Sequence, residues 1–220
     1  MPNAPVAGTK IFGKISIPNY AFDGIKYYKV VQTSVYAFRY CNLITSVIFP
    51  STLEIIGTDT VWGTSITDLF IPKSVRILKS FAFSTASKLE KIFFEQGIKI
   101  IFESYVFHGC YNLNNVILPS SIYYSNNLFV RTNISFLYVC SRRVDIDEKN
   151  HFLNAYQIPS IFVTKGYKSD KFLGQNVTIM ENEDYCFDDI LPLHSCDCNR
   201  YYLRKVSIFY IVPFVLIFDS

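Results

Sequence analysis

The chain has 220 residues, and its 50% apolar and 17% aromatic side chains can fill a packed interior, which excludes a chain that is disordered throughout. The formal net charge is only +3 and the Lys and Arg residues are scattered, so the sequence lacks the basic stripe of a nucleic-acid-binding surface. Glycine is sparse and no G-x-x-x-x-G-K motif occurs, which excludes that phosphate-binding loop.

Residues 1–10 are predicted to form an N-terminal tail. This tail lacks the positively charged start and the apolar run of a conventional signal peptide. The first strand motif follows at Ile15-Ser-Ile-Pro18, and Pro18 precedes Pro50 by 32 residues. That spacing predicts an insertion or a degenerate unit between the two prolines.

One strand motif recurs from about residue 41 to about residue 140. In the second half of each motif, apolar positions alternate with positions whose residue differs between copies, and a proline usually follows. Such alternation predicts a short half-buried strand, and proline ends the strand because it has no N–H to donate. Successive motifs end 21 to 24 residues apart, at Pro50, Pro72, Glu95, Pro119 and Cys140.

Two further blocks recur in the same repeat. A branched apolar segment, as in residues 53–57 and 75–78, predicts a second short strand. An Ala-Phe pair or a related pair predicts a tight helical turn whose ring points into the interior. A single unit cannot bury its own apolar face, so the units are expected to stack. The pairs are Ala37-Phe38, Ala82-Phe83 and Val106-Phe107.

The whole pattern resembles the BspA-like family of leucine-rich repeats. Ile71-Pro-Lys-Ser-Val75 and the run from Val106 to Pro119 carry the resemblance, which covers about residues 11–140 and extends weakly to residues 161–172. Glu95 in place of a proline and Thr60-Val61 in place of Ala-Phe depart from it. The resemblance implies an α/β leucine-rich-repeat solenoid that is rich in β-structure, with short parallel strands, turns and short helical segments in each coil.

This solenoid is expected to span residues 11–180, with clear units at about residues 41–140 and a terminal strand and helix cap at about residues 158–180. Members of the family are mostly surface or secreted proteins of bacteria and protist parasites, implicated in adhesion to host cells or matrix proteins. The resemblance therefore implies a non-enzymatic protein without a cofactor that binds a protein ligand at the cell surface. An intracellular scaffold built on the same repeats is the alternative.

The outward positions of the predicted strands form two columns. Residues between the buried ones of a strand face away from the core, and neighbouring strands lie about 4.8 Å apart. One column is apolar, and the other is mostly polar and includes Asp68 and Lys91. We predict that a protein partner contacts these columns; alternatively, a flank or a second copy of the chain covers the rings. The apolar column is Ile48, Phe70, Phe93, Ile117 and Tyr138.

Candidates for chemistry are few, and the sequence predicts no catalytic, cofactor-binding or metal-binding residue. Cys186, His194, Cys196 and Cys198 form the densest group of potential ligands. Zinc sites normally use paired C-x₂₋₄-C motifs, whereas this group has a single C-x-C. A local disulfide or free thiols are therefore favoured over a metal site or an enzyme site in residues 186–198.

Other isolated residues also receive an interpretation from the repeat. Cys41 and Cys110 lie at the cysteine position of the unit and are expected to pack as buried thiols. His108 is two residues from Cys110, a spacing at which side chains do not converge, so a Cys–His catalytic pair is not expected. Asn133 and Asn176 begin N-x-S/T triplets and are candidate N-glycosylation sites if the chain is secreted.

Residues 181–205 form an acidic segment that contains cysteines, and residues 206–218 form a short apolar tail. As a helix, this tail would reach only about 20 Å, less than the roughly 30 Å of a hydrocarbon core. Pro213 would weaken such a helix further. Membrane association of the tail is the favoured interpretation. The alternatives are a terminal strand that seals the last repeat and a cleaved lipid-anchor signal.

Overall fold

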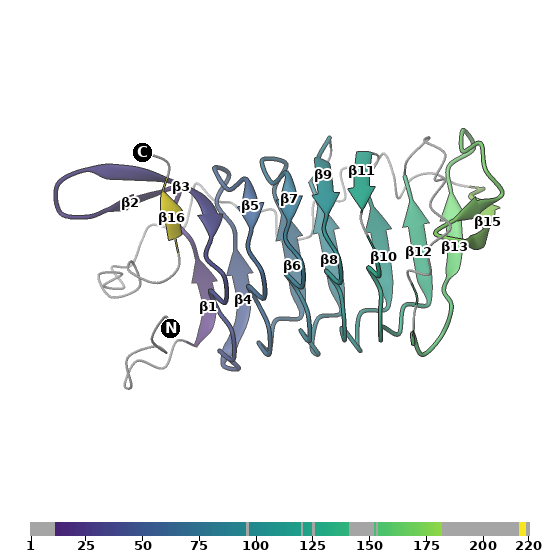
Figure 1. Cartoon of the computed structure of the whole chain (residues 1–220), viewed down its shortest axis with the longest axis horizontal. Helices are drawn as coiled ribbons and strands as arrows, with labels where there is room; N and C mark the ends of the chain where they lie inside the picture. Colours follow the sequence, from purple (N-terminus) through teal and green to yellow (C-terminus); the bar gives the residue numbers. More distant parts are fainter. Residues whose placement is uncertain are drawn as a thin grey trace.

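The computed structural model describes residues 12–95, 97–119, 121–124, 126–140, 152, 154–181 and, by backbone alone, the strand at 216–218. These residues form a row of stacked coils, which Figure 1 draws with its long axis horizontal. Strands of successive coils lie side by side in two sheets that enclose one continuous core. The chain is therefore a β-solenoid, as the regular spacing predicts.

The first sheet contains the strands of the proline-ended motif. Neighbouring strands of this sheet are parallel, except for the pair at one end, Lys171–Phe172 and Gln175–Ile179, which is antiparallel. Its order is β14 (Lys171–Phe172), β15 (Gln175–Ile179), β13 (Ser160–Val163), β12 (Phe136–Val139), β10 (Asn115–Leu118), β8 (Lys91–Phe94) and β6 (Asp68–Ile71). Next to β6 lies a separate parallel pair, β1 (Gly13–Ser16) and β4 (Ile44–Ile48).

The second sheet contains the strands of the branched apolar segments. Parallel pairing joins β11 (Ser121–Tyr124), β9 (Lys99–Phe102), β7 (Ile77–Leu78), β5 (Ile55–Ile56) and β3 (Tyr27–Thr33) in that order. Two strands pair antiparallel with β3: β2 (Tyr20–Phe22) and β16 (Leu216–Phe218). The hairpin of β2 and β3 projects from the end of the solenoid (Figure 1) and is the insertion that the long first spacing allows.

Phenylalanine rings from successive coils form a spine inside the solenoid. The rings of Phe83 and Phe107 lie 5.8 Å apart, and Phe107 stacks on Phe129 at 5.4 Å. Phe129 in turn stacks on Phe152 at 5.5 Å. These side chains are buried, and they occupy the second position of the Ala-Phe pair or its equivalent. The prediction that these rings fill the interior is confirmed.

The predicted helical turns are wrong: the residues that the structure describes contain no helix. The Phe83 N–H donates to the Val106 carbonyl of the next coil at 3.1 Å, and Phe107 donates in the same way to Leu128. A helix would instead use the carbonyl four residues earlier in the same segment. Two residues before each phenylalanine the backbone is left-handed, as at Phe81 (φ 61°) and Tyr105 (φ 62°). The turns are therefore held by an inter-coil ladder, in which hydrogen bonds join the turns of neighbouring coils. The α-helical part of the predicted fold class is wrong.

The helix that the sequence predicts within residues 158–180 is also absent. This span contains the strands β13, β14 and β15 instead. β14 folds back antiparallel onto β15 and covers the edge of the first sheet at this end. Capping is needed because the outermost strand of a solenoid has no neighbouring coil to satisfy its backbone groups. The cap of the last coil is thus a short hairpin.

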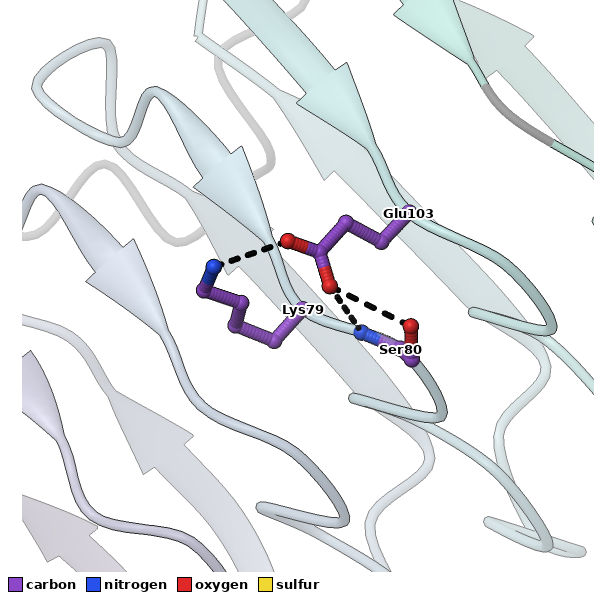
Figure 2. Close-up of polar contacts among 3 residues, drawn as sticks. All are labelled: Lys79, Ser80 and Glu103. Atoms are coloured by element: carbon purple, nitrogen blue, oxygen red, sulfur yellow. Dashed lines mark hydrogen bonds and ion pairs between the residues drawn. The ribbon is translucent and has the colours of Figure 1, made fainter.

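Carboxylates join neighbouring coils, as Glu103 and Glu95 illustrate. Figure 2 shows Glu103, which accepts hydrogen bonds from the Lys79 Nζ at 2.8 Å and from the Ser80 N–H at 3.0 Å. Burial alone would raise the pKa of Glu103, but these hydrogen bonds and the charge of Lys79 outweigh it, so the pKa lies below its usual value. Glu95, which replaces a motif proline, accepts the Lys73 N–H of the preceding coil at 2.8 Å. That departure from the repeat therefore adds a contact between coils.

The other departure, Thr60-Val61, also has a structural reason. The buried hydroxyls of Thr33 and Thr60 hydrogen-bond to each other at 2.9 Å, and Thr33 also accepts the Gly57 N–H at 2.8 Å. Backbone and side chain approach so closely here that a Cβ on Gly57 would lie 2.5 Å from the Thr33 carbonyl oxygen. The hydroxyl of Thr60 thus takes the place of the alanine in this coil, and the buried Val61 takes the place of the phenylalanine.

The apolar C-terminal tail is described only at its end. Residues 216–218 pair with β3 of the first coil, not with the last repeat as the strand alternative supposed. In the first sheet the edge at the last repeat is covered by β14, and in the second sheet residues 216–218 pair with the part of β3 that extends beyond the short β2. Within the described part of the chain, no helix is long and apolar enough to cross a bilayer.

Candidate interaction surface

The structure places the predicted apolar column in register across the first sheet. Phe70 pairs with Phe93, and Ile117 pairs with Tyr138. Ile48 lies on β4, which belongs to the separate pair and is aligned with Ser16 of β1. Phe70 is 37% exposed, and the other four side chains are half-buried. Lys91 pairs with Asn115 and Ile92 with Val116, and this register continues the column of partly exposed side chains from β6 to β12.

The structure extends this column by one residue that the sequence analysis missed. Phe162 of β13 pairs with Tyr138, and the two rings stack 5.4 Å apart. Phe136, 41% exposed, also lies against Phe162, with ring centres 6.2 Å apart. The signal was present in Ile161-Phe-Val163, which repeats the apolar alternation of the earlier strands. We call the set Phe70, Phe93, Ile117, Tyr138 and Phe162 the ring column.

The polar column lies beside the ring column. Asp68 and Lys91 pair in register, and Asn115 pairs with Lys91 on its other side. All three side chains are exposed. Asp68 accepts a hydrogen bond from the neighbouring Thr67 hydroxyl at 2.8 Å, whereas Lys91 has no ion-pair partner among the described residues. A ligand on the ring column would thus meet charges of both signs along one side.

A second outward apolar column lies on the second sheet and was not predicted. Ile55 pairs with Ile77, Ile77 with Ile101, and Ile101 with Tyr123. Ile101 and Tyr123 are exposed, and the other two are half-buried. The two-residue strands β5 and β7 hide this alternation, because the sequence shows it only once the coils are aligned.

The cysteine and histidine of the repeat do not form a reactive pair. Cys110 is buried and its thiol donates to the Phe83 carbonyl at 3.2 Å. Burial raises the pKa of Cys110 to about 12, so this sulfur stays protonated at neutral pH. His108 instead has its Nδ1 3.4 Å from the Ser84 hydroxyl, and burial together with the charge of Arg131 lowers its pKa. Burial raises the pKa of Cys41 as well, although its side chain is only half-buried.

The remaining candidates are placed as follows. Asn133 and Asn176 are exposed, so both N-x-S/T triplets present their acceptor side chains to solvent. Cys186, His194, Cys196 and Cys198 lie outside the described residues. Within the part that the structure describes, no group of three or more His, Cys, Asp or Glu side chains could hold a metal ion.

Comparison with known proteins identifies the repeat. The model of the BspA type leucine-rich repeat region matches residues 31–159 in six copies. The chain is similar to the structure of a T. pallidum leucine-rich repeat protein (TpLRR), with a TM-score of 0.50 and 19% identity, covering 71% of this chain and 75% of that chain. This likeness shows the fold alone.

Two further solved structures are similar at a lower TM-score. One is a leucine-rich cell surface protein from Faecalibacterium prausnitzii A2-165, with a TM-score of 0.48 and 19% identity over 76% of this chain and 47% of that chain. The other is the pneumococcal vaccine antigen PcpA, with a TM-score of 0.49 and 16% identity over 77% and 60%. No curated protein matches the sequence. Because the family model covers more than half of its residues, the chain belongs to the BspA type leucine-rich repeat family.

Proposed function

We propose that this chain is a recognition module that binds a protein ligand through the ring column of the first sheet. The observation that carries the proposal is the in-register row from Phe70 to Phe162, flanked by Asp68 and Lys91. Aromatic side chains are rigid and large, and they supply much of the energy of typical protein interfaces. Charges at the side of such a row orient the ligand and speed its association.

The proposal includes adhesion to a host or matrix protein and a place at the cell surface. Membership of the family supports a protein ligand, because leucine-rich repeat proteins generally bind proteins. Membrane association through residues 206–218 belongs to the same proposal. Labelling of intact cells with a reagent that does not enter them distinguishes this location from that of an intracellular scaffold.

Two double variants test the surface. Phe70→Asp with Phe93→Asp places charges on the ring column, whereas Ile77→Asp with Ile101→Asp places them on the column of the second sheet. Binding of the full chain to immobilised fibronectin, laminin and collagen is measured by surface plasmon resonance. The first variant is expected to lose at least about tenfold in affinity for the protein that binds, and the second to bind as the wild type does.

Two results would contradict the proposal. One is a first-sheet variant that keeps its circular dichroism spectrum and thermal midpoint and still binds unchanged. The other is equal loss in both variants, because the ring column would then have no special part in binding.

A further inference from the structure

The turn edge of the middle and last coils carries a polar patch that is separate from the ring column. This edge, along the bottom of Figure 1, is where each coil leaves its inter-coil ladder and enters a strand of the first sheet. Two shallow depressions lie there. Glu90, Lys91, Asn112, Asn114 and Asn115 line the first. Tyr111, Asn133 and Tyr156 line the second.

The two depressions belong to one patch. Tyr111 and Asn112 are consecutive, and each lines one of them. The coil that carries Asn133 lies directly beside the coil that carries Asn114, because the Ser135 N–H donates to the Asn114 carbonyl at 2.9 Å. A ligand longer than one ring can therefore contact both depressions at once.

The amides of this patch are available to a ligand. Among the described residues, the side chains of Asn112, Asn114, Asn115 and Asn133 make no hydrogen bond, and Glu90 makes neither a hydrogen bond nor an ion pair. Each amide offers two N–H donors and one carbonyl acceptor, and Glu90 adds an acceptor. Such a set matches groups that both donate and accept, as the hydroxyls of a sugar do.

Aromatic rings adjoin these amides. Tyr111 and Tyr156 meet edge to face with ring centres 5.8 Å apart, so they form an exposed corner of two rings. Phe136 pairs in register with Asn115 and is exposed beside the first depression. An aromatic face packs well against the apolar C–H face of a pyranose ring, while the neighbouring amides reach its hydroxyls. Glu90 and Lys91 have opposite charges, which favours a ligand without net charge.

We propose that this edge of the solenoid is a binding site for a neutral oligosaccharide. Tyr111 and Tyr156 stack on one sugar ring, and Asn112, Asn114 and Asn115 bind the hydroxyls of the next. The site adjoins the proposed protein-binding surface and shares Lys91 with its polar flank, but Phe70 and Phe93 lie outside it, so either proposal can fail without the other.

Saturation-transfer NMR tests the site with the full chain and four neutral probes: mannotriose, galactotriose, maltotriose and chitotriose, each at millimolar concentration. The protein is produced in a host without N-glycosylation, so Asn133 keeps its free amide. We expect transfer to at least one probe. Tyr156→Ala is expected to weaken its binding about tenfold, and Asn112→Ala with Asn115→Ala to weaken it by a similar factor.

Tyr27→Ala is the matched control, because Tyr27 and Tyr156 are both 69% exposed and Tyr27 lies on the β2–β3 hairpin at the other end of the solenoid. It is expected to leave binding unchanged. The absence of transfer to all four probes, or binding that survives Tyr156→Ala, overturns the proposal. Equal loss in Tyr27→Ala also overturns it, because binding would then not depend on this edge.

A sugar at this edge has two possible sources, a free oligosaccharide or a glycan attached to Asn133. Chain produced in a glycosylating host distinguishes them, with Ser135→Ala as the unmodified control, because this change removes the N-x-S triplet and keeps the Asn133 amide. If the attached glycan blocks the probe and its own sugar protons show contacts with the rings of Tyr111 and Tyr156, the site holds the glycan of its own chain. If the probe still binds, the site takes a foreign sugar.

Discussion

The two sheets of the solenoid both carry an outward apolar column, but the columns differ in chemistry. The column of the second sheet is mostly isoleucine, at positions 55, 77 and 101, before it ends in Tyr123. The column of the first sheet is mostly aromatic, and Tyr138 stacks on Phe162. β-Branched side chains suit strands whether or not a ligand binds, so the isoleucine column needs no partner to explain it.

This difference teaches that an exposed apolar column on a solenoid does not by itself mark a binding surface. The kind of side chain, and its neighbours on the same face, must decide between the two sheets. The variants that follow first compare the outward ring column with the interior that both sheets share. They then probe the contacts that hold the second sheet together.

The largest expected effect separates the interior spine from the ring column. Phe107→Ala removes a ring that contacts both Phe83 and Phe129, so the free energy of unfolding is expected to fall by about 3–5 kcal/mol. Phe70→Ala, on the outward face, is expected to cost no more than about 1 kcal/mol. Urea denaturation of both variants measures the difference. Similar losses would mean that the ring column is part of the core and not a surface.

A smaller loss of stability is expected at Gly57, where the backbone of one coil lies against that of the preceding coil. Gly57→Ala brings a methyl group to within 2.5 Å of the Thr33 carbonyl oxygen, which forces the backbone apart and should cost about 2–3 kcal/mol. Gly97→Ala is the control, because it has open space around its Cβ and only a left-handed backbone (φ 76°) to resist it, at about 1 kcal/mol. Thermal unfolding of the two variants gives the order, and a reversed order would contradict the close approach.

Glu103→Gln tests the link between coils on the side of the second sheet. The carboxylate accepts from Lys79 and Ser80, so its loss should cost about 1 kcal/mol at neutral pH, a modest value because the group is partly exposed. The folded chain holds the pKa of Glu103 below its usual value. Its contribution is therefore present above the usual carboxyl pKa and is lost as pH falls through the lowered one.

The difference in stability between Glu103→Gln and the wild type should accordingly shrink in acid. Glu90→Gln is the matched control, because Glu90 has no ion pair and no side-chain hydrogen bond among the described residues. It is expected to be neutral at every pH. A difference for Glu103→Gln that persists in acid would show that the carboxylate does not act through its charge.

The smallest expected effect concerns the reactivity of two cysteine thiols and involves no change in the free energy of unfolding. Cys110 is buried with its pKa raised to about 12, whereas Cys41 is half-buried. Thiol alkylation of the folded chain near pH 8, followed by peptide mass mapping, should label Cys41 before Cys110. In urea the two cysteines should react alike. Equal labelling in the folded chain would place Cys110 outside the core.

The sequence was sufficient to predict the strands of the first sheet and the phenylalanine spine, because both depend on a pattern within each coil. It was not sufficient for the turns. Ala-Phe is compatible with a helical turn, and only the neighbouring coil, which accepts the N–H groups of Phe83 and Phe107, selects the ladder instead. A contact between coils cannot be seen in the sequence of one coil.

The surfaces follow the same rule. The ring column could be predicted from Phe70 to Tyr138, because the regular spacing aligns those strands. The sequence assigns residues 158–180 to a cap, so Phe162 was missed although its strand follows β12 at a spacing that also occurs between earlier strands. The corner of Tyr111 and Tyr156 joins residues of coils that are not consecutive in the strand pattern. No motif connects these two residues, so only the stacked structure shows them together.

The inter-coil ladder of the turns has a direction. On this edge, Phe81 donates its N–H to Ser104, Phe83 to Val106, and Tyr105 to Asn126, each toward the coil that follows in the chain. The opposite direction holds where each coil enters the first sheet, because the Ser65 N–H donates to the Ile44 carbonyl and the Ser135 N–H to the Asn114 carbonyl, each in the preceding coil. Proteins tolerate an unsatisfied carbonyl better than an orphaned amide. Loss of a coil from either end would therefore leave unpaired N–H groups on the coil that remains, so a shortened version of this solenoid needs a new cap at whichever end is cut.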